Sequence, residues 1–266
     1  MHTDSKAKRK EREMVAFSVS LVFAICALVQ IGQTIGIGVL YSREKSNNCL
    51  WPLTGTNDIA GRGVTLSNVG NLDLCALVLA TVAVSAVANG IMTWLAHKGE
   101  ESAAGKWHVA ESVIRWSELA ITSTAMSAIV ARVAGISDRA ALLLLIVLKL
   151  MSMGIGFIVE RADENDGHGV MWRAIFLAWA IFIFQWSLLL GSYWSMVNDS
   201  KISIDQVVHI LVMGVFAGLF LVLLWQLLWI IFKFDERAYR SGMALVGLAG
   251  KTIFIWTAFN GGVCTR

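Results

Sequence analysis

Ionisable side chains lie inside long apolar stretches of this 266-residue chain. One stretch contains Glu111, Arg115 and Glu118, and another contains Lys251. A charge at the centre of a bilayer costs about 2.5–3.5 kcal/mol even on lenient insertion scales, so such residues indicate a functional site. A desolvated lysine loses its proton easily and becomes nucleophilic, which suits Schiff-base formation with an aldehyde. The iminium that results is a buried cation and requires a carboxylate.

The spacing of these residues predicts which of them meet. Glu111, Arg115 and Glu118 follow one another at helical spacing on one face, which must point into a helix bundle because a charged stripe cannot face lipid. Lys251 lies about eleven residues, or roughly 16 Å, from the end of its span, and Glu118 lies about ten residues from the same side. We expect the two to be neighbours, either as a structural ion pair or as lysine and counterion. Gly247 beside the lysine leaves room for a bulky ligand.

The elements that position these residues are membrane helices. Hydrophobic residues make up 56% of the chain and charged residues 15%, whereas soluble proteins carry about 25% charged residues. This composition excludes a disordered chain, a disulfide scaffold and an ordinary soluble enzyme, and a dispersed net charge of +3 does not support nucleic-acid binding. A span needs about 20 mainly apolar residues. Seven stretches qualify, over residues 14–40, 69–96, 108–133, 140–160, 170–197, 204–232 and 240–259.

The predicted fold is an all-α membrane protein, a seven-transmembrane-helix bundle in which residues 1–266 form a single domain. Twelve Lys and Arg residues flank one side of the spans and seven flank the other, so the N-terminus is expected to be cytoplasmic and the C-terminus outside. Residues 1–13 then form a basic cytoplasmic tail. Residues 41–68 are turn-rich, and we expect an ordered extracellular cap loop with short strands there. Cys49 and Cys264 both lie on the outer side, where a disulfide stays one alternative.

A lysine in the middle of the seventh span of such a bundle resembles the retinal-binding rhodopsins. The pattern Arg115-Trp116-x-Glu118 in the third span, together with a cytoplasmic N-terminus, resembles the heliorhodopsin family specifically. Ordinary microbial rhodopsins face the other way and carry an aspartate four residues before the lysine, where this chain has Gly247. The likeness spans all seven helices. It implies all-trans retinal bound covalently to Lys251 as a protonated Schiff base, Glu118 as counterion, light sensing with a slow photocycle rather than efficient pumping, and a homodimer in the membrane.

The resemblance also implies residues that line the chromophore. Ser123 and Met126, five and eight residues after Glu118, would lie along it. Aromatic residues of the fifth and sixth spans suit a polyene pocket, although each is alternatively a packing residue or an interface anchor. The expected retinal pocket comprises Trp116, Thr122, Ser123, Met126, Trp179, Trp186, Phe216, Phe220 and Gly247, and Phe182 and Trp225 are further aromatic candidates.

Polar residues near the lysine define candidates for a proton path. Members of the family typically carry histidines on the first two helices, whereas these spans contain Gln30, Gln33 and Asn89 and no histidine. The seventh span offers no carboxylate, so an efficient outward pump is not supported. The proton-path candidates are Glu111, Arg115, Lys149, Gln30 and Asn89.

The role of Lys149 has more than one interpretation, and these lead to different functions for the protein. The lysine lies in the middle of the fourth span with no carboxylate within a turn on its own helix. Lys149 is the rival candidate for the Schiff base, although it lacks the carboxylate motif and flanking glycines of Lys251. This second buried cation, together with Glu111, Arg115 and Glu160, also favours an alternative function, a light-gated proton channel. A light-independent transporter is a further alternative, but the spans lack the proline-broken helices typical of transporters. No enzyme motif or metal site is predicted, and retinal and lipid are the expected partners.

Overall fold

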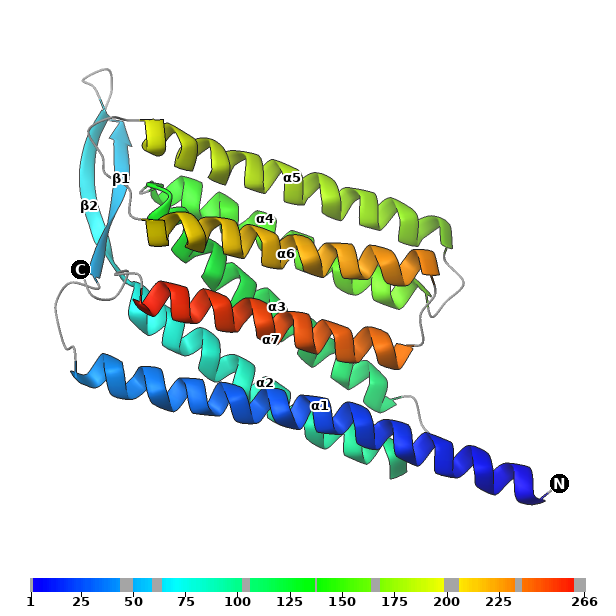
Figure 1. The fold of residues 1–266 in the computed structure, drawn as a ribbon. Coiled ribbons are helices and arrows are strands. Elements are labelled where there is room, and N and C mark those ends of the chain that lie inside the picture. Colours follow the sequence, from blue (N-terminus) through cyan, green and yellow to red (C-terminus); the bar gives the residue numbers. More distant parts are fainter. Residues whose placement is uncertain are drawn as a thin grey trace.

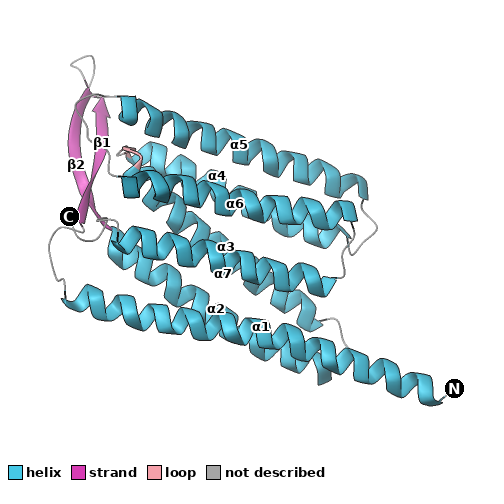
Figure 2. Ribbon diagram, in the orientation of Figure 1, coloured by secondary structure: helices cyan, strands magenta, loops and turns pink. Residues whose placement is uncertain are grey.

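A computed structural model of the chain describes residues 2–43, 50–58, 64–101, 106–136, 138–163, 168–198, 206–232 and 236–260. This part forms helices that run side by side, with a two-stranded sheet at one end (Figures 1 and 2). Helix α1 begins at one end of the bundle, and α7 finishes at the end that carries the sheet (Figure 1). The helices are α1 (His2–Arg43), α2 (Leu74–Glu101), α3 (Lys106–Val133), α4 (Arg139–Asp163), α5 (His168–Asn198), α6 (Gln206–Phe232) and α7 (Glu236–Asn260).

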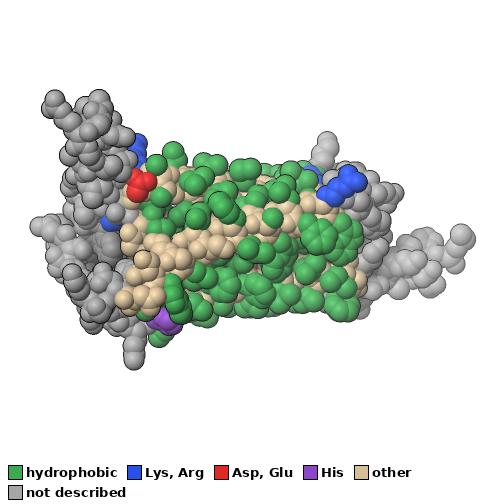
Figure 3. Space-filling view, turned by 90° about the horizontal axis from the view of Figure 1, so that it is seen from above, with side chains coloured by type: hydrophobic (Ala, Val, Ile, Leu, Met, Phe, Trp, Pro, Cys, Tyr) green, Lys and Arg blue, Asp and Glu red, His purple; other side chains and the backbone are tan. Residues whose placement is uncertain are grey.

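Six of the described helices are long and apolar enough to cross a membrane, and α3 is not among them. The charged and hydroxyl side chains of α3 lower its mean hydropathy, although its length of 28 residues suffices for a span. Helix α3 packs against α2, α4 and α6, so neighbouring helices surround its polar face. Between its two ends, the surface seen in Figure 3 shows hydrophobic side chains with a band of backbone and other side chains among them, and the coloured charged side chains lie toward the ends, as a lipid-facing surface requires.

The sheet is a hairpin between α1 and α2. Strand β1 (Leu50–Asp58) pairs antiparallel with β2 (Val64–Asp73), and a bulge interrupts the register between Leu53 and Thr54. Residues 69–73, expected to begin the second span, belong instead to β2. Glycine, asparagine and aspartate in this segment are poor helix formers, and Asp73 stands directly before α2, where aspartate is favoured as a cap. Cys49 and Cys264 lie outside the described residues.

Helix α1 extends beyond the apolar span toward the N-terminus. It begins at His2, so residues 2–13 of the expected basic tail are helical and continuous with the first span. Lysine, arginine, glutamate and alanine are strong helix formers, and the segment contains no proline to interrupt the helix.

A tight turn joins α3 to α4 and sets these two helices side by side. Gly135 has a φ of 86°, which glycine adopts without steric cost. The amides of Gly135 and Ile136 bond back to the carbonyls of Arg132 and Ala131 at 3.1 and 2.9 Å, the pattern of a Schellman helix end. Asp138 then caps α4 by accepting the Ala141 amide at 2.8 Å. Local sequence therefore determines the antiparallel pairing on which much of the site depends.

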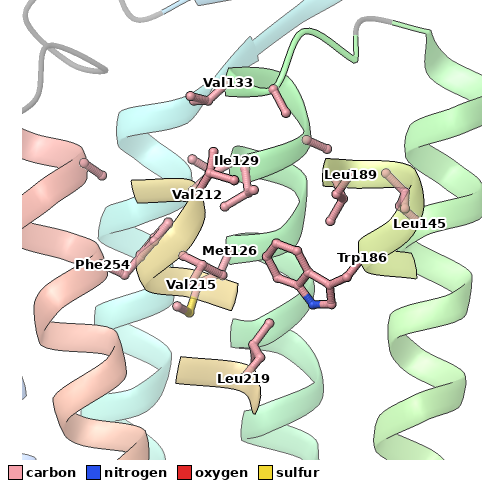
Figure 4. Packing of buried hydrophobic residues seen from close by; sticks show 14 of the residues in the cluster. Met126, Ile129, Val133, Leu145, Trp186, Leu189, Val212, Val215, Leu219 and Phe254 are labelled. Carbon is pink, nitrogen blue, oxygen red and sulfur yellow. The ribbon is translucent and has the colours of Figure 1, made fainter. Parts of the chain in front are cut away.

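Two apolar clusters fill the bundle. The hairpin-end cluster lies nearer the sheet, and Figure 4 shows Phe254 and Trp186 pointing from opposite sides toward Met126 and Val215 within it. The opposite-end cluster lies nearer the start of α3. The hairpin-end cluster includes Met126, Ile129, Val130, Leu145, Phe182, Trp186, Leu189, Val212, Val215, Leu219, Phe254 and Ile255, and the opposite-end cluster includes Trp116, Leu119, Met153, Val159, Ile175, Val222, Trp229, Tyr239 and Met243.

Candidate functional site

Lys251 and Glu118 form a buried ion pair between α7 and α3. The lysine Nζ donates to Glu118 Oε1, and the two residues are 7% and 5% exposed. The hydroxyl of Ser85 on α2 donates to the same carboxylate oxygen. Three helices thus meet at one carboxylate, and the lysine and glutamate placed at equal depth by sequence are brought together.

The pair lies where the two apolar clusters meet. Glu118 precedes Leu119 of the opposite-end cluster, and Met126 of the hairpin-end cluster follows two turns later. Thr122, one turn after Glu118, is fully buried, and its hydroxyl donates to the Glu118 carbonyl at 2.9 Å. A Cβ built on Gly247 would meet no atom within 4 Å, so there is open space one turn from the lysine.

Amide side chains of α1 and α2 surround the pair on one side. Asn89 Nδ2 donates to Gln30 Oε1 at 2.8 Å and to the Ser85 carbonyl at 2.9 Å. Gln33 Nε2 donates to the hydroxyl of Thr252, the residue after the lysine, at 2.9 Å. A cavity extends along these groups, and its lining includes Gln30, Asn89, Arg115, Glu118, Gly247 and Lys251.

A second charged network lies toward the start of α3. Arg115 Nη2 donates to Glu160 Oε1 on α4, and its Nη1 lies 3.4 Å from Glu111 Oε1. Glu111 Oε2 also accepts from Arg240 Nη1 on α7 at 2.9 Å. Among the described residues, Arg115 therefore pairs with Glu111 and Glu160, although sequence spacing placed it in one stripe with Glu118.

Ser85 and Arg240 were not site candidates from sequence, and Glu160 entered only as support for an ion-conducting route. Ser85 carries no pattern that separates it from other hydroxyl residues of a span. Glu160 and Arg240 stand near span ends, where charged residues are ordinary. The signal for Glu160 was its position at the same end as Glu111, but periodicity on one helix does not say which neighbouring helix faces it.

Aromatic residues of α5 and α6 gather in the hairpin-end cluster. Trp179 meets Phe220 edge-on with ring centroids 5.5 Å apart, and Trp186 meets Phe216 at 5.0 Å. Phe182 contacts both tryptophans and stacks on Phe216 at 5.9 Å. The structure thus brings together the four aromatic pocket residues expected on these helices, with Met126 in the same cluster.

Two tryptophan candidates lie elsewhere. The Trp116 indole N–H donates to Glu160 Oε2 at 2.7 Å, and its ring covers Gly156 of α4. The Trp225 indole N–H donates to the Tyr239 carbonyl at 3.2 Å, and its ring covers Gly242 of α7. Both rings pack with the opposite-end cluster, away from the aromatic group around Trp186.

Lys149 and Ser123 complete the candidates. Lys149 on α4 is 1% exposed, and no ion pair or hydrogen bond joins it to another described residue. Ser123 on α3 is buried, and its hydroxyl has no partner in the described part of the chain. Neither residue joins the network around Glu118.

This arrangement suits an aldehyde with a long apolar tail. Lys251 provides the only amine among the described residues that is paired with a buried carboxylate inside the bundle. The neighbouring open space and aromatic cluster suit an extended apolar group.

Comparison with known proteins identifies the family. The model of the heliorhodopsin family matches residues 17–263, nearly the whole chain. No curated protein matches the sequence. The match covers all seven helices and confirms the resemblance seen in the sequence. The chain therefore belongs to the heliorhodopsin family, and it is a retinal-binding, light-sensing rhodopsin and a multi-pass integral membrane protein.

Proposed function

We propose that all-trans retinal is joined to Lys251 through a Schiff base and that Glu118 is the counterion of its protonated form. The observation that carries this proposal is the buried pair of Lys251 and Glu118. Converting the amine into an iminium keeps one positive charge at this place, so the carboxylate already present balances it. Removing one member of a buried pair leaves an uncompensated charge, which costs about 3–5 kcal/mol.

The residues present fit retinal on two further grounds. Gly247 leaves open space one turn from Lys251, where a larger residue would occupy the volume next to the amine. Trp179, Trp186, Phe216 and Phe220 form an aromatic group on α5 and α6. An extended polyene packs well against such apolar rings. Retinal, when bound, supplies light absorption and a change of shape next to Glu118.

The polar groups around Glu118 support a sensor with a slow photocycle rather than a pump. A pump needs a proton acceptor and a separate donor on opposite sides of the lysine. The described carboxylates inside the bundle, Glu111, Glu118 and Glu160, lie at the lysine's level or toward the start of α3. Toward the hairpin, the buried core contains Met126, Ile129 and Val130. A proton released near Lys251 therefore leaves and returns on one side.

We further propose that the N-terminus is cytoplasmic and the hairpin extracellular. The support is the excess of Lys and Arg at the end where α1 begins. Single cysteines at positions 5 and 61 in a cysteine-free variant, labelled in intact cells with a membrane-impermeant maleimide, test this orientation. Labelling at position 61 alone is expected, and labelling at position 5 alone would reverse the assignment.

A light-gated proton channel is the second candidate, and the charged network favours it. Glu118 and Arg115 line one cavity, and Arg115 connects through Glu111 to Arg240 near the start of α7. Conduction additionally needs a path through the hairpin-end cluster. Voltage-clamped photocurrents separate the candidates, because a current that reverses with the proton gradient identifies passive conduction and its absence supports the sensor.

The chromophore assignment is tested by visible spectroscopy after expression with all-trans retinal. An absorbance band is expected in the wild type and in Lys149→Ala, and no band in Lys251→Ala. Replacing Glu118 by Gln is expected to shift the band to the red, because a counterion stabilises the localised cation of the ground state. A band that survives in Lys251→Ala and vanishes in Lys149→Ala would transfer the attachment to Lys149.

The family resemblance also supports a homodimer. Mass measurement of the detergent-solubilised protein, with the detergent contribution subtracted, is expected to give twice the chain mass of 29.1 kDa. A mass of one chain across detergents would contradict the proposal.

A further inference from the structure

Lys149 carries an amine that no ion pair or hydrogen bond joins to another described residue, so its protonated form has no described partner to balance it. Glu111 pairs with Arg115 and Arg240, Glu118 pairs with Lys251, and Glu160 pairs with Arg115. Every buried carboxylate of the described bundle interior is thus already engaged. Lys149 is 1% exposed in the middle of an apolar span, where an uncompensated charge is disfavoured.

Helix geometry places hydroxyl groups of α3 at the level of Lys149. Ser112 on α3 donates to Glu160 on α4 at 2.6 Å, so these two positions face each other. The helices are antiparallel neighbours, and eleven residues make about three turns. Counting eleven residues back along α4 leads to Lys149, and eleven forward along α3 leads to Ser123. Both therefore lie at one level on the facing sides of their helices.

Helix α5 adds an amide near the same level. The Ser192 hydroxyl on α5 donates to the Ala134 carbonyl on α3 at 3.0 Å. Two turns back along both helices, seven residues in each case, lie Gln185 and Ser127. Gln185 is 1% exposed and Ser127 is 2% exposed, one turn from Ser123 along α3.

The polar atoms of this group lack partners. In the described part of the chain, no hydrogen-bond partner is found for the hydroxyls of Ser123, Ser127 and Ser152 or for either amide atom of Gln185. Ser152 lies one turn from Lys149 on α4. Buried polar groups are normally hydrogen-bonded, so several unpaired ones on α4 and on the helices packed on either side of it, α3 and α5, point to a bound ligand.

We propose that a small monovalent anion of the halide class binds between α3, α4 and α5, held by Lys149, Ser123, Ser127, Ser152 and Gln185. The ammonium, the hydroxyls and the amide NH₂ are all donors, and no carboxylate belongs to the group. The protonated form of Lys149 would repel a cation, and one monovalent anion would balance its single charge. This site, which we call the Lys149 anion site, differs from the counterion site at Glu118, and it assigns to the anion the hydroxyl of Ser123, which the family resemblance placed along the chromophore.

The Lys149 anion site requires a free amine at position 149 and so rests on the proposed attachment of retinal to Lys251. The decisive measurement is therefore made on the protein without retinal, where both lysines are free amines. If retinal is not attached to Lys251, the visible spectra of the two lysine variants would show it. Failure of the anion site would appear in chloride binding, which needs no chromophore.

The experiment is equilibrium binding of radioactive chloride to retinal-free protein in detergent, with gluconate as the inert anion. Wild type is expected to bind one chloride per chain with saturation, and its unfolding midpoint is expected to rise with chloride. Lys149→Met, which keeps a similar length without the charge, is expected to lose both effects. Arg173→Met removes an exposed cation of α5 and is expected to keep both.

Two results would overturn the proposal: no saturable chloride binding in the wild type, or equal binding in wild type and Lys149→Met. If Lys149→Met fails to fold, the double variant Ser123→Ala and Ser127→Ala provides the second test. It removes two hydroxyl donors and is expected to weaken chloride binding at least tenfold. Unchanged affinity in that variant would likewise reject these residues as ligands.

Discussion

Gly156 of α4 offers a sharp test of how the network around Arg115 is held. A Cβ at this position would lie 2.4 and 2.5 Å from two ring carbons of Trp116, closer than atoms can approach. Replacing Gly156 by Ala must therefore move the Trp116 ring. That ring is 5% exposed, and its N–H donates to Glu160, so it cannot move freely.

The expected cost follows from three contributions. Overpacking of a filled core costs about 1–3 kcal/mol. Weakening the indole hydrogen bond to a charged carboxylate costs about 1.5–3 kcal/mol. Alanine is favoured over glycine in a helix by about 1 kcal/mol, which acts in the opposite direction. The net expectation for Gly156→Ala is a loss of about 1.5–5 kcal/mol in the free energy of unfolding.

The assay is unfolding of the purified protein in mixed detergent by titration with sodium dodecyl sulfate, followed by tryptophan fluorescence. Gly154, two residues earlier on α4, is the matched control, because a Cβ there would meet no atom within 4 Å. Gly154→Ala is expected to leave stability unchanged or to raise it by up to about 1 kcal/mol. Equal effects of the two variants would refute the packing of Trp116 against Gly156.

Three further outcomes are expected. Glu160→Gln should lower the free energy of unfolding by about 1.5–3 kcal/mol in the same titration, since it weakens a hydrogen bond to the charged Arg115, and a change below about 0.5 kcal/mol would contradict that role. Ser85→Ala should shift the visible band to the blue, because a carboxylate of Glu118 that accepts one fewer hydrogen bond is a stronger counterion; a red shift would oppose this. Gly247→Leu should slow pigment formation from added retinal several-fold by filling the space beside the reactive lysine, and an unchanged rate would show that this space is not used.

The pairing of Lys251 with Glu118 was predictable because it follows from the depth of each residue in the membrane. Helix rise is constant at 1.5 Å per residue, so counting from a common membrane surface places two residues at one level without knowledge of neighbours. The burial of both followed from the cost of exposing charge to lipid. The same reasoning could not include Ser85, because a hydroxyl is tolerated at many places in a span.

The partners of Arg115 were not predictable in this way. Periodicity showed that Arg115, Glu111 and Glu118 share a helix face, but a face of about 100° can meet two neighbouring helices. The turn at Gly135 and Asp138 sets α4 against α3, and this places Glu160 beside Arg115. Because α4 lies against α3, the Trp116 ring packs on α4 and is not part of the aromatic group on α5 and α6.

The start of the second helix shows a limit of apolar patterns. Residues 69–73 include valine and leucine and directly precede the apolar run of α2. They nevertheless pair with β1 in the hairpin. Strand pairing is a contact between segments distant in sequence, whereas hydropathy is summed over a local window. Glycine and asparagine within the segment were the local indication that a helix would begin later.

The sequence by itself determined the family, the number of helices, and the level at which Lys251 and Glu118 meet, because hydropathy and helix rise are properties of one segment at a time. Only the tertiary structure decided which helices face each other, and hence that Arg115 pairs with Glu160, that the Trp116 indole bonds to Glu160, and that hydroxyl and amide groups on α3, α4 and α5 are buried without described partners. The physical reason is that partner choice depends on the rotation and packing of whole helices about their axes. Rotation is set by all of the contacts of a helix together, and no single stretch of sequence contains them.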